Sequence, residues 1–404
     1  MATIGKNMNR PAHVPAELFV DVDTYAPPGG EQDYHQAIKN IQDRCPDIFW
    51  VPYRGGHWVA TRGEDLNVIL KNSDVFGSYP KTIPKEEANP VRLPPIEVDP
   101  PVQTQYRNLI NPWFTPKSVG NLEGQARENS IALIEGFYAR GECEFVREFA
   151  SHLPIAIFMN LVALPYEDRE PLMRLAETPV YAKDHDEIIA AFRKMFEYIA
   201  VKLKEREKNP GTDLLSKIAT AEFDGKPLTF EEKTGTATLA LIGGLDTVAS
   251  TMGFVANFLA THPAHRRQLV ENPALIGNAV EEFLRRFGVA TSSRILNQDF
   301  EYKGIQFRKG DQIHTMLNLH GLDDRCFPNP MEVDFTRKNP LHSTFGQGPH
   351  RCPGSFLART EIRVFLEEWL KRIPDFRVKD GEQVKIRSGV NGSFTYLPLQ
   401  WDVK

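Results

Sequence analysis

The most constraining feature of the sequence is a glycine-rich loop that carries a cysteine, at residues 345–354 (Phe-Gly-Gln-Gly-Pro-His-Arg-Cys-Pro-Gly), with the apolar pattern of a helix directly behind it. Unpaired N–H groups and the positive end of the peptide dipoles at a helix start favour an anion, so we expect the thiol of Cys352 to titrate below its free value. We expect Pro353 to suit the first helical turn, and Gly348 and Gly354 to leave room for a large planar group. The loop predicts a thiolate ligand, and a buried structural cysteine is the alternative.

A second constraint is a pair of glycines inside a long helical pattern, residues 231–259. The middle of this stretch, residues 242–247, reads Ile-Gly-Gly-Leu-Asp-Thr, and each glycine costs about 1 kcal/mol relative to alanine. Close approach of another group or a local opening of the helix would require glycine there. An opened helix offers a slot for a diatomic ligand, to which the Thr247 hydroxyl can bond, and Asp246 adds a titratable group. The alternative is helix–helix packing at small residues, with Asp246 facing solvent.

Length and composition favour one large domain, residues 1–404. The chain is 41% hydrophobic and 25% charged, which allows a large core, and it has no Pro/Gly/Ser linker. A net charge of −5 without a dominant basic block argues against nucleic acid as a partner. The four cysteines show no short pairing pattern, and residues 1–20 hold no apolar run of membrane-spanning length. We therefore expect a reduced, soluble, cytoplasmic protein without a membrane anchor.

Helical patterns dominate the remaining chain, and strands are expected only in short groups. Apolar residues recur at three- and four-residue spacing over residues 188–203, which predicts an amphipathic helix. Strands are predicted at 48–53 and 57–61 around a Gly-Gly turn, around 300–313 after Arg294, and at 385–387 and 394–397. The predicted fold class is mostly α with small β-sheets.

The cysteine loop resembles the haem-ligand loop of the cytochrome P-450 superfamily, whose pattern Phe-x-x-Gly-x-x-x-Cys-x-Gly is matched by Phe345, Gly348, Cys352 and Gly354. The resemblance implies a single P-450-type domain and a haem-thiolate monooxygenase. The thiolate of Cys352 would be the proximal ligand of the iron of haem b, with O2 as co-substrate. No Cys-x-x-Cys-His occurs in the sequence, so the haem is expected to be held without covalent attachment.

The glycine pair is similar to the oxygen-binding signature of the same family, Ala/Gly-Gly-x-Asp/Glu-Thr, which residues Gly243 to Thr247 match. The resemblance implies that Thr247 steadies the activated oxygen and that Asp246 relays protons from solvent, because cleavage of the O–O bond needs protons on the outer oxygen. Two rivals stay open. A peroxide-driven enzyme of the same fold would dispense with this pair of residues, and a haem-based sensor would keep Cys352 but need no proton relay.

A structural motif of the family is also matched. Glu282-Phe283-Leu284-Arg285 resembles its Glu-x-x-Arg, where a buried ion pair ties a helix to the segment that leads to the haem loop. The family often adds a third basic partner, whose usual arginine aligns with Glu332 here. Arg337 is therefore a possible substitute.

Three positions match the residues that hold the haem propionates in the family, namely Arg107, Arg294 and His350, and Gln103 is a fourth candidate. Propionates are anions that need hydrogen-bond donors, and an amide at position 103 can donate where many relatives have histidine. For any one of these residues alone, an ordinary surface position is the alternative.

Across nearly the whole chain the likeness is greatest to the bacterial camphor-hydroxylating subfamily, and residues 55–62, 282–286 and 333–337 carry it. The pocket departs from that relative. Val91 stands in the place of the tyrosine whose hydroxyl holds the ketone of camphor, and Leu93 replaces a phenylalanine. Loss of such a hydrogen bond costs about 0.5–1.5 kcal/mol, so camphor is expected to bind poorly or to react at several carbons.

The pocket wall implied by the resemblance is largely apolar, which suits a small hydrophobic terpenoid or norisoprenoid substrate. Besides Val91 and Leu93, the matched positions are Leu239, Ile242, Val289, Ser292, Val390 and Asn391. We expect Asn391, at the tip of the C-terminal hairpin, to take over as the polar contact for a substrate oxygen. The alternative is a turn residue, because Asn-Gly is a strong turn signal. The helical stretch 188–203, with residues 178–186 before it, matches the mobile cover over this pocket.

Electrons are expected from a separate protein, because the sequence has no Gly-x-Gly-x-x-Gly fingerprint and no room for a flavin domain. The resemblance implies a ferredoxin with a 2Fe–2S cluster, fed by an NADH-dependent ferredoxin reductase. Arg107 and Arg359 are expected to meet its acidic surface. Thr104 and Asn339 occupy places that are basic in the camphor relative, which suggests a different cognate ferredoxin.

Overall fold

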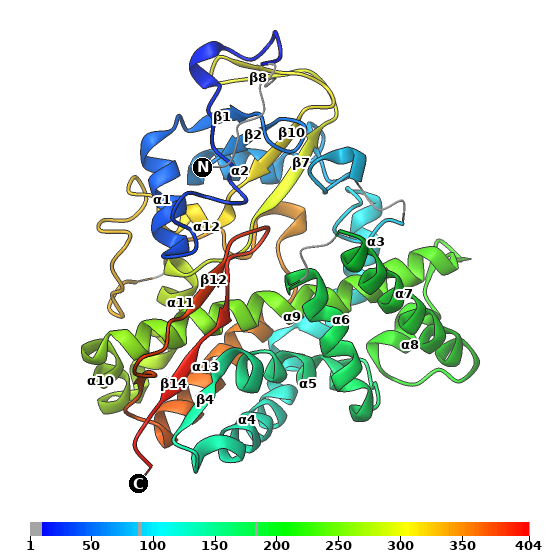
Figure 1. Ribbon diagram of the computed structural model, residues 1–404. Coiled ribbons are helices and arrows are strands. Elements are labelled where there is room, and N and C mark those ends of the chain that lie inside the picture. Colours follow the sequence, from blue (N-terminus) through cyan, green and yellow to red (C-terminus); the bar gives the residue numbers. More distant parts are fainter. Residues whose placement is uncertain (1–9, 88–90, 182–184, 339, 404) are drawn as a thin grey trace.

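A long helix, α9 (Phe230–Thr261), crosses the middle of the molecule, and most other helices lie around it (Figure 1). The computed structural model describes residues 10–403 except 88–90, 182–184 and 339. Thr229 and Glu232 form a capping box that satisfies N–H groups at the start of α9. The helix confirms the predicted one. Of the described helices, only α9 has the length and apolar composition of a membrane-spanning segment. However, 59% of its most apolar stretch is buried inside the protein, as expected of a core helix.

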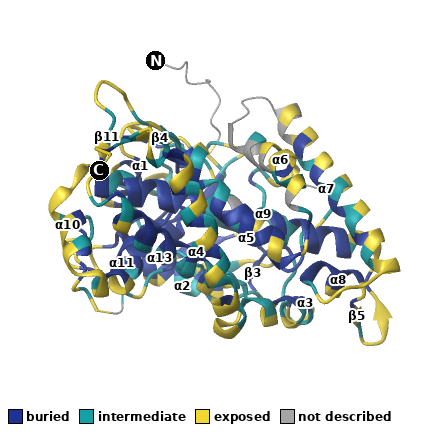
Figure 2. Ribbon diagram, turned by 90° about the horizontal axis from the view of Figure 1, so that it is seen from below, coloured by how far each residue is buried: buried dark blue, intermediate teal, exposed yellow. Residues whose placement is uncertain are grey.

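The helices next to α9 build the main hydrophobic core. The helices α5 (His152–Leu161) and α7 (His185–Lys208) contact α9, and α4 (Pro116–Tyr138) packs along α13 (Ser355–Arg372). Figure 2 shows that the centre, where α5, α9 and α13 meet, is buried, whereas the outer sides of α7 and α10 are exposed. The other described helices are α1 (Tyr34–Arg44), α2 (Gly63–Lys71), α3 (Val102–Ile110), α6 (Arg169–Tyr181), α8 (Leu214–Ala219), α10 (Pro263–Glu271), α11 (Ile276–Arg286) and α12 (Leu317–His320).

The predicted amphipathic stripe of residues 188–203 is confirmed where the structure describes it. Met195, Ile199 and Leu203 lie on one face of α7 and are buried against α5, α8 and α9. The side chain of residue 188 is outside the described part. Residues 182–184, which belong to the expected cover 178–186, also lie outside the described residues.

The largest sheet stands beside the helical core and contains the predicted hairpin. Strands β1 (Ile48–Val51) and β2 (His57–Ala60) pair antiparallel around Gly55 and Gly56, whose φ angles of +78° and +86° favour glycine. The strand order β1-β2-β10-β7-β3 brings β10 (Gln312–Thr315) and β7 (Ser292–Leu296) next to this hairpin, with β3 (Phe76–Gly77) at the edge. The strand β7 begins before Arg294, so the predicted strand region starts earlier than expected.

Small two- and three-stranded sheets complete the fold. The C-terminal hairpin pairs β12 (Lys385–Arg387) with β13 (Ser393–Tyr396), as predicted. The remaining strands are β4 (Glu142–Glu144), β5 (Glu222–Phe223), β6 (Lys226–Pro227), β8 (Phe300–Tyr302), β9 (Ile305–Phe307), β11 (Arg377–Val378) and β14 (Pro398–Gln400). The fold class is confirmed as mostly α with small sheets.

The predicted ion pair between Glu282 and Arg285 is buried and ties α11 to the segment before the cysteine loop. The Arg285 guanidinium donates to both carboxylate oxygens of Glu282, over 2.8 and 2.7 Å, and to the main-chain oxygens of residues 321, 330 and 332. Arg337 is confirmed as the third basic partner, with its Nε 3.2 Å from Glu282 Oε2. Position 332 contributes only its carbonyl.

We expect Arg285→Leu to lower the free energy of unfolding by about 3–5 kcal/mol, because it leaves the Glu282 charge buried without its main partner. Arg337→Gln should cost less, since Arg285 remains. Urea titration of the folded protein measures both. Arg377→Gln is the matched control: its pair with Asp380 is exposed, and its loss should leave the unfolding midpoint unchanged. Equal midpoints for Arg285→Leu and wild type would contradict the assignment.

Candidate functional site

The cysteine loop is closed by its own main chain. The Cys352 N–H donates to the carbonyl of Phe345 over 2.8 Å, and the Gly346 N–H donates to the carbonyl of Ser343 over 2.7 Å. The guanidinium carbon of Arg359 lies 4.6 Å from the centre of the Phe345 ring. The loop therefore fixes the thiol just before α13 begins. The helix starts at Ser355, so the prediction that Pro353 sits in its first turn is wrong.

The expectation that the Cys352 thiol titrates below its free value is also wrong for the protein as it stands. Burial raises the pKa of this thiol and outweighs a hydrogen bond from the Gly354 N–H and the positive charges of Arg107 and Arg359, which lower it. The loop thus supplies the predicted donors and charges but does not by itself ionise the sulfur. Cys352 would hold a metal cation as a thiolate, because coordination would favour loss of the thiol proton.

One of the two loop glycines, Gly348, has a different role from that predicted. A Cβ on Gly348 would lie 2.4 Å from the carbonyl oxygen of Leu70, and its φ is +66°, so this glycine is required by contact with α2 and not by a planar group. A Cβ on Gly354 would lie 3.8 Å from Cys352 Sγ, an ordinary contact distance. Gly348 therefore positions the loop in the fold.

The paired glycines of α9 border open space. A Cβ on Gly243 or Gly244 would meet no heavy atom within 4 Å among the described residues, so close helix–helix packing does not explain them. The helix is continuous through this stretch, and the predicted local opening is absent. The free space beside the helix main chain is what a flat group such as haem would fill, so the residues present fit the cofactor that the sequence implies.

The Asp246 carboxylate is held by two neutral donors. Asn391 Nδ2 donates to Asp246 Oδ2 over 3.0 Å, and Ser250 Oγ donates to Oδ1 over 3.4 Å. The carbonyl of Thr247 accepts from Thr251 Oγ1 over 2.9 Å. Sequence reasoning missed the bond between Asn391 and Asp246, because these residues are 145 positions apart and no local pattern joins them.

Arg294 is the clearest candidate for binding an acidic group of the cofactor. Its side chain on β7 is 3% exposed, and its Nη1 donates only to the Ser293 carbonyl and the Ser292 hydroxyl. Burial lowers its pKa to about 10, with Asp99 acting in the opposite direction, so the guanidinium stays charged at neutral pH. No carboxylate forms an ion pair with it in the described part of the chain, and a buried cation of this kind requires an anion.

Two other predicted anchors come from α3 and bond to the cysteine loop. Gln103 Nε2 donates to the carbonyl of Pro349 over 2.7 Å, and Arg107 Nη2 donates to the carbonyl of Arg351 over 2.8 Å. Gln103 and Arg107 thereby hold the loop main chain, and the Arg107 charge acts on the nearby thiol. Their predicted role as donors to the haem propionates stays a prediction.

The fourth anchor, His350, belongs to a small network that sequence reasoning missed. Its Nε2 lies 2.8 Å from Ser78 Oγ and 3.3 Å from Asp99 Oδ1. Burial lowers the pKa of His350, and the bond to Asp99 opposes it. An acidic residue directly before Pro100-Pro101, at the start of α3, was the available signal. Asp99 orients His350, so this histidine is a positioned donor and not a surface residue.

Lys81 is another polar residue that was not predicted. Its carbonyl accepts a bond from Ser293 Oγ, next to Arg294. Burial and the neighbouring Arg294 lower its pKa to about 8, and Glu97 acts against this shift. Lys81 therefore adds a second titratable cation beside Arg294.

The predicted pocket residues come from three segments that the structure brings together around α9. A Cβ on Gly235 would lie 2.2 Å from the carbonyl of Arg92, so the loop with Val91 and Leu93 rests directly on α9, one turn before Leu239. An antiparallel bridge joins Ala290 to Asn391, which brings the predicted positions 289–292 and 390–391 side by side.

The pocket positions differ in exposure. Val289 is buried in the main core, whereas Val390 is 58% exposed, and Leu239 and Ile242 are half-buried. Neither Asn391 nor Gly392 has a positive φ, so the alternative of a tight Asn-Gly turn is wrong. Gly392 is required for another reason, because a Cβ there would lie 2.3 Å from Cε1 of Tyr34.

Comparison with known proteins agrees with this geometry over the whole chain. The sequence pattern of the Cytochrome P450 family matches residues 164–401. The protein named probable cytochrome P450 127A1 of Sinorhizobium fredii is 31% identical over 400 residues, which cover 97% of this chain and 96% of that protein. The vitamin D(3) 25-hydroxylase of Pseudonocardia autotrophica is 30% identical over 357 residues, 87% of this chain and 89% of that protein.

Solved structures give the same result. The crystal structure of CYP101J2 matches with a TM-score of 0.90 and 36% identity, and that of CYP101C1 with 0.89 and 35%, each over 98% of this chain and 100% of the other. Because these relatives agree with the chain over nearly its full length, the chain belongs to the cytochrome P450 family and is a monooxygenase that uses haem b, a cysteine thiolate ligand and O2.

Proposed function

We propose that this enzyme hydroxylates a small hydrophobic terpenoid or norisoprenoid substrate, with electrons from a 2Fe–2S ferredoxin and its NADH-dependent reductase. The observation that carries the proposal is the largely apolar wall around α9, beside glycines that face open space. One oxygen atom of O2 enters a C–H bond of the substrate and the other leaves as water, with two electrons from the ferredoxin and two protons from solvent. The relatives are named for substrates as different as vitamin D(3), nocardicin C and mycinamicin IV, so the pocket must decide the substrate.

In this proposal Cys352 binds the haem iron, and the residues around the loop hold the rest of the cofactor. Bound haem b supplies the activation of O2. The buried, unpaired Arg294 binds a propionate, and His350, oriented by Asp99, donates to the same group of anions. Gln103 and Arg107 keep the loop carbonyls in place beside them. The Phe345 carbonyl closes the loop by accepting from the Cys352 N–H, and Gly354 and Gly243 leave space for the haem ring.

Asp246 and Thr247 carry the proton chemistry in this proposal. Asp246 is half-exposed on α9 and its carboxylate is held by neutral donors, so it can exchange a proton with solvent. Thr247 is the next residue of the same helix, and its hydroxyl makes no bond to another described side chain. The two residues therefore pass protons toward the oxygen that leaves as water.

The substrate wall supports a hydrophobic ligand without a strong directional anchor at position 91. Val91 and Leu93 lie in the loop that rests on α9, near Leu239 and Ile242. Val289, Ser292, Val390 and Asn391 complete the proposed wall from the other side. Ser292 Oγ already accepts from Arg294, so it offers limited polar contact to a substrate. Camphor, which needs a donor for its ketone, should bind poorly.

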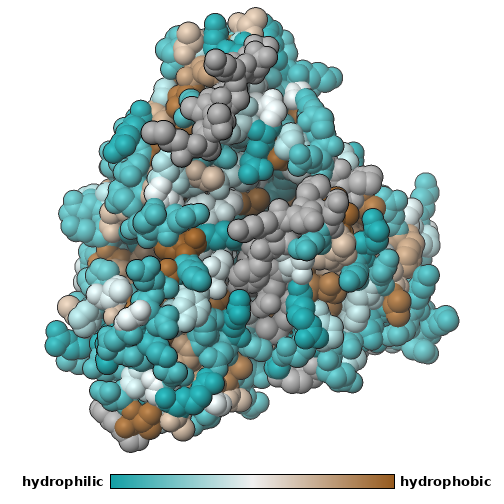
Figure 3. All heavy atoms as spheres, in the orientation of Figure 1, coloured by the Kyte–Doolittle hydropathy of each residue, from teal (hydrophilic) through white to brown (hydrophobic). Residues whose placement is uncertain are grey.

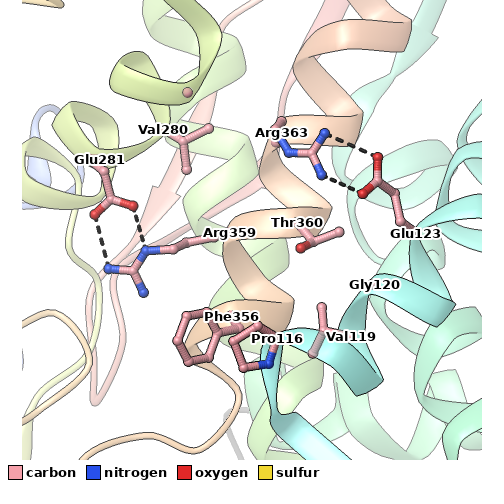
Figure 4. Close-up of a pocket in the computed structure, with 11 residues that line it drawn as sticks. Pro116, Val119, Gly120, Glu123, Val280, Glu281, Phe356, Arg359, Thr360 and Arg363 are labelled. Carbon is pink, nitrogen blue, oxygen red and sulfur yellow. Dashed lines mark hydrogen bonds and ion pairs between the residues drawn. The ribbon is translucent and has the colours of Figure 1, made fainter.

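In this proposal the electron donor docks at a hollow beside α13 that has both apolar and charged residues in its lining. A hollow of about 350 Å³ lies between α4, α11 and α13 and is lined by Pro116, Val119, Val280 and Phe356 (Figure 4). Phe356 stands at its edge and is 47% exposed. The face of the molecule seen in Figure 3 is mostly hydrophilic, and its apolar residues form small separate groups.

The charges around this hollow are already paired, which changes the expected mode of docking. Arg359 donates to both carboxylate oxygens of Glu281, over 2.5 and 3.0 Å, and Arg363 does so with Glu123 over 3.2 and 2.7 Å. Burial raises the pKa of Glu281, but bonds from His342 and Arg359 bring it down to about 2, so the pair persists at neutral pH. In this proposal Arg359 meets the ferredoxin as one half of an ion pair. Position 104 is exposed and uncharged, and residue 339 lies outside the described part.

The proposal includes a cytoplasmic location and no nucleic-acid or membrane partner. Cys45, Cys143, Cys326 and Cys352 are all free thiols in the structure, which suits a reducing compartment.

Cys352→Ser should abolish the red-displaced absorption that the reduced, carbon monoxide-treated haem protein shows with a thiolate ligand, because a serine hydroxyl does not replace the thiolate. The spectrum of dithionite-reduced protein under carbon monoxide measures this. Cys326→Ser, which alters an exposed thiol away from the loop, is the matched control and should keep the band. A thiolate-type spectrum from Cys352→Ser would refute the ligand assignment.

Val91→Tyr should tighten binding of camphor about 2- to 10-fold, because it restores one hydrogen bond to a ketone. The dissociation constant is read from the shift of the Soret band on titration with camphor. Val91→Phe is the control, since it adds the ring without the hydroxyl and should gain less. Equal gains for the two variants would show that ring volume, and not the hydroxyl, decides affinity.

Phe356→Ala should raise the KM for the ferredoxin several-fold while the KM for the substrate stays constant, because it removes the apolar edge of the docking hollow. The KM for ferredoxin should change little with ionic strength if the hollow dominates docking, since Arg359 and Arg363 at the hollow are each paired with a carboxylate. Phe230→Ala, another exposed phenylalanine at the far end of α9, serves as control. A steep loss of ferredoxin affinity with added salt would argue for charge-driven docking instead.

A further inference from the structure

The C-terminal hairpin reaches the middle of α9 and contacts its acidic residue directly. Asn391 Nδ2 lies 3.0 Å from Asp246 Oδ2, between two segments that are distant in the sequence. The red hairpin lies against α9 in Figure 1. A second contact follows two helical turns later, where a Cβ on Gly253 would lie 3.5 Å from the Phe394 ring. Positions 246 and 253 therefore share the face of α9 on which the hairpin rests.

The tip of the hairpin is fixed by contacts that do not involve Asp246. Asn391 forms an antiparallel bridge with Ala290, and Thr291 Oγ1 donates to the Val390 carbonyl over 2.9 Å. Gly392 fits against the ring of Tyr34, whose hydroxyl accepts from Asn318 Nδ2 over 2.8 Å. The amide of Asn391 is thus presented to α9 by a rigid support, which limits where the bonded carboxylate can lie.

The partners of Asp246 are both uncharged. Its carboxylate accepts from the Asn391 amide and from Ser250 Oγ, and no lysine, arginine or histidine of the described chain lies within ion-pair distance. A neutral donor holds a carboxylate in one rotamer yet releases it at the cost of a single hydrogen bond, whereas a buried ion pair resists both movement and protonation. A residue that must take up and pass on protons benefits from the first arrangement.

We propose that Asn391 is a positioning residue for proton delivery, which holds the Asp246 carboxylate through its amide N–H. The inference rests on the proposed monooxygenase function and assigns Asn391 a role at Asp246 in place of a primary role at the substrate. The amide nitrogen is committed to the carboxylate, so the hairpin couples the C-terminal part of the chain to the oxygen-activating helix.

Asn391→Val tests this role, because valine is similar in size and lacks the amide. The assay uses holoenzyme, a 2Fe–2S ferredoxin system, NADH and β-ionone as the probe substrate. The share of electrons that ends in hydrogen peroxide should rise about threefold or more, with a larger solvent isotope effect on product formation. The dissociation constant of β-ionone, read from the Soret shift, should change by less than about twofold. Thr395→Val, in the same hairpin, is the matched control and should change neither quantity.

A double-variant cycle separates positioning from a general structural effect. In an Asp246→Asn background, Asn391→Val should no longer change the electron partition, because the group that it positions is gone. Urea unfolding gives a readout independent of turnover: the midpoint shift caused by Asn391→Val should shrink in that background.

Several results would overturn the proposal. Weaker β-ionone binding with an unchanged electron partition would show that Asn391 contacts the substrate. Additive effects of Asn391→Val and Asp246→Asn would show that the two residues are not coupled. If wild-type protein lacked the thiolate-type carbon monoxide spectrum, the proposed function would fail instead, so the two failures are distinguishable.

Discussion

The structure depends on how the cysteine loop holds a sulfur that its surroundings alone do not ionise. The loop is closed by its main chain, supported by Gln103 and Arg107, and backed by the Glu282–Arg285 pair through the preceding segment. Burial keeps the proton on the free thiol, while the N–H of Gly354 and nearby arginines favour the anion. Binding of the haem iron would therefore favour the thiolate form of Cys352. Folding of the loop and binding of the cofactor would stabilise each other.

Local patterns predicted those parts of the fold that depend on local physics. The central helix, the hairpin around Gly55 and Gly56, the stripe of α7 and the Glu282–Arg285 pair follow from periodicity, turn chemistry and spacing. The family resemblance added Arg337 as the third basic partner, and the structure confirms it. These features need only neighbours in sequence or a short motif to be read correctly.

The features that were missed or wrong depend on contacts between distant segments. Gly348 is required because it lies against the carbonyl of Leu70, and Gly392 because it lies against the ring of Tyr34. The amide of Asn391 bonds to Asp246. No local sequence pattern indicates any of these partners. The thiol pKa was wrong because the helix start was weighed without the burial that opposes it. The ion pair between Arg359 and Glu281 was not predicted, because Glu281 on α11 is not adjacent in sequence. The motifs therefore predicted which residues belong to the site, whereas contacts between distant segments determine the partner of each residue.

The close approach of Gly235 to the carbonyl of Arg92 affects which pocket residues can be replaced without changing the backbone. The loop that carries Val91 and Leu93 leans on α9 through main-chain atoms, so its path does not depend on the identity of the side chains that it presents. Residues 91 and 93 can be exchanged during evolution, or in a mutant library, while the scaffold beneath them keeps its shape. The substrate preference can then change through one or two substitutions while the backbone conformation of the pocket stays the same.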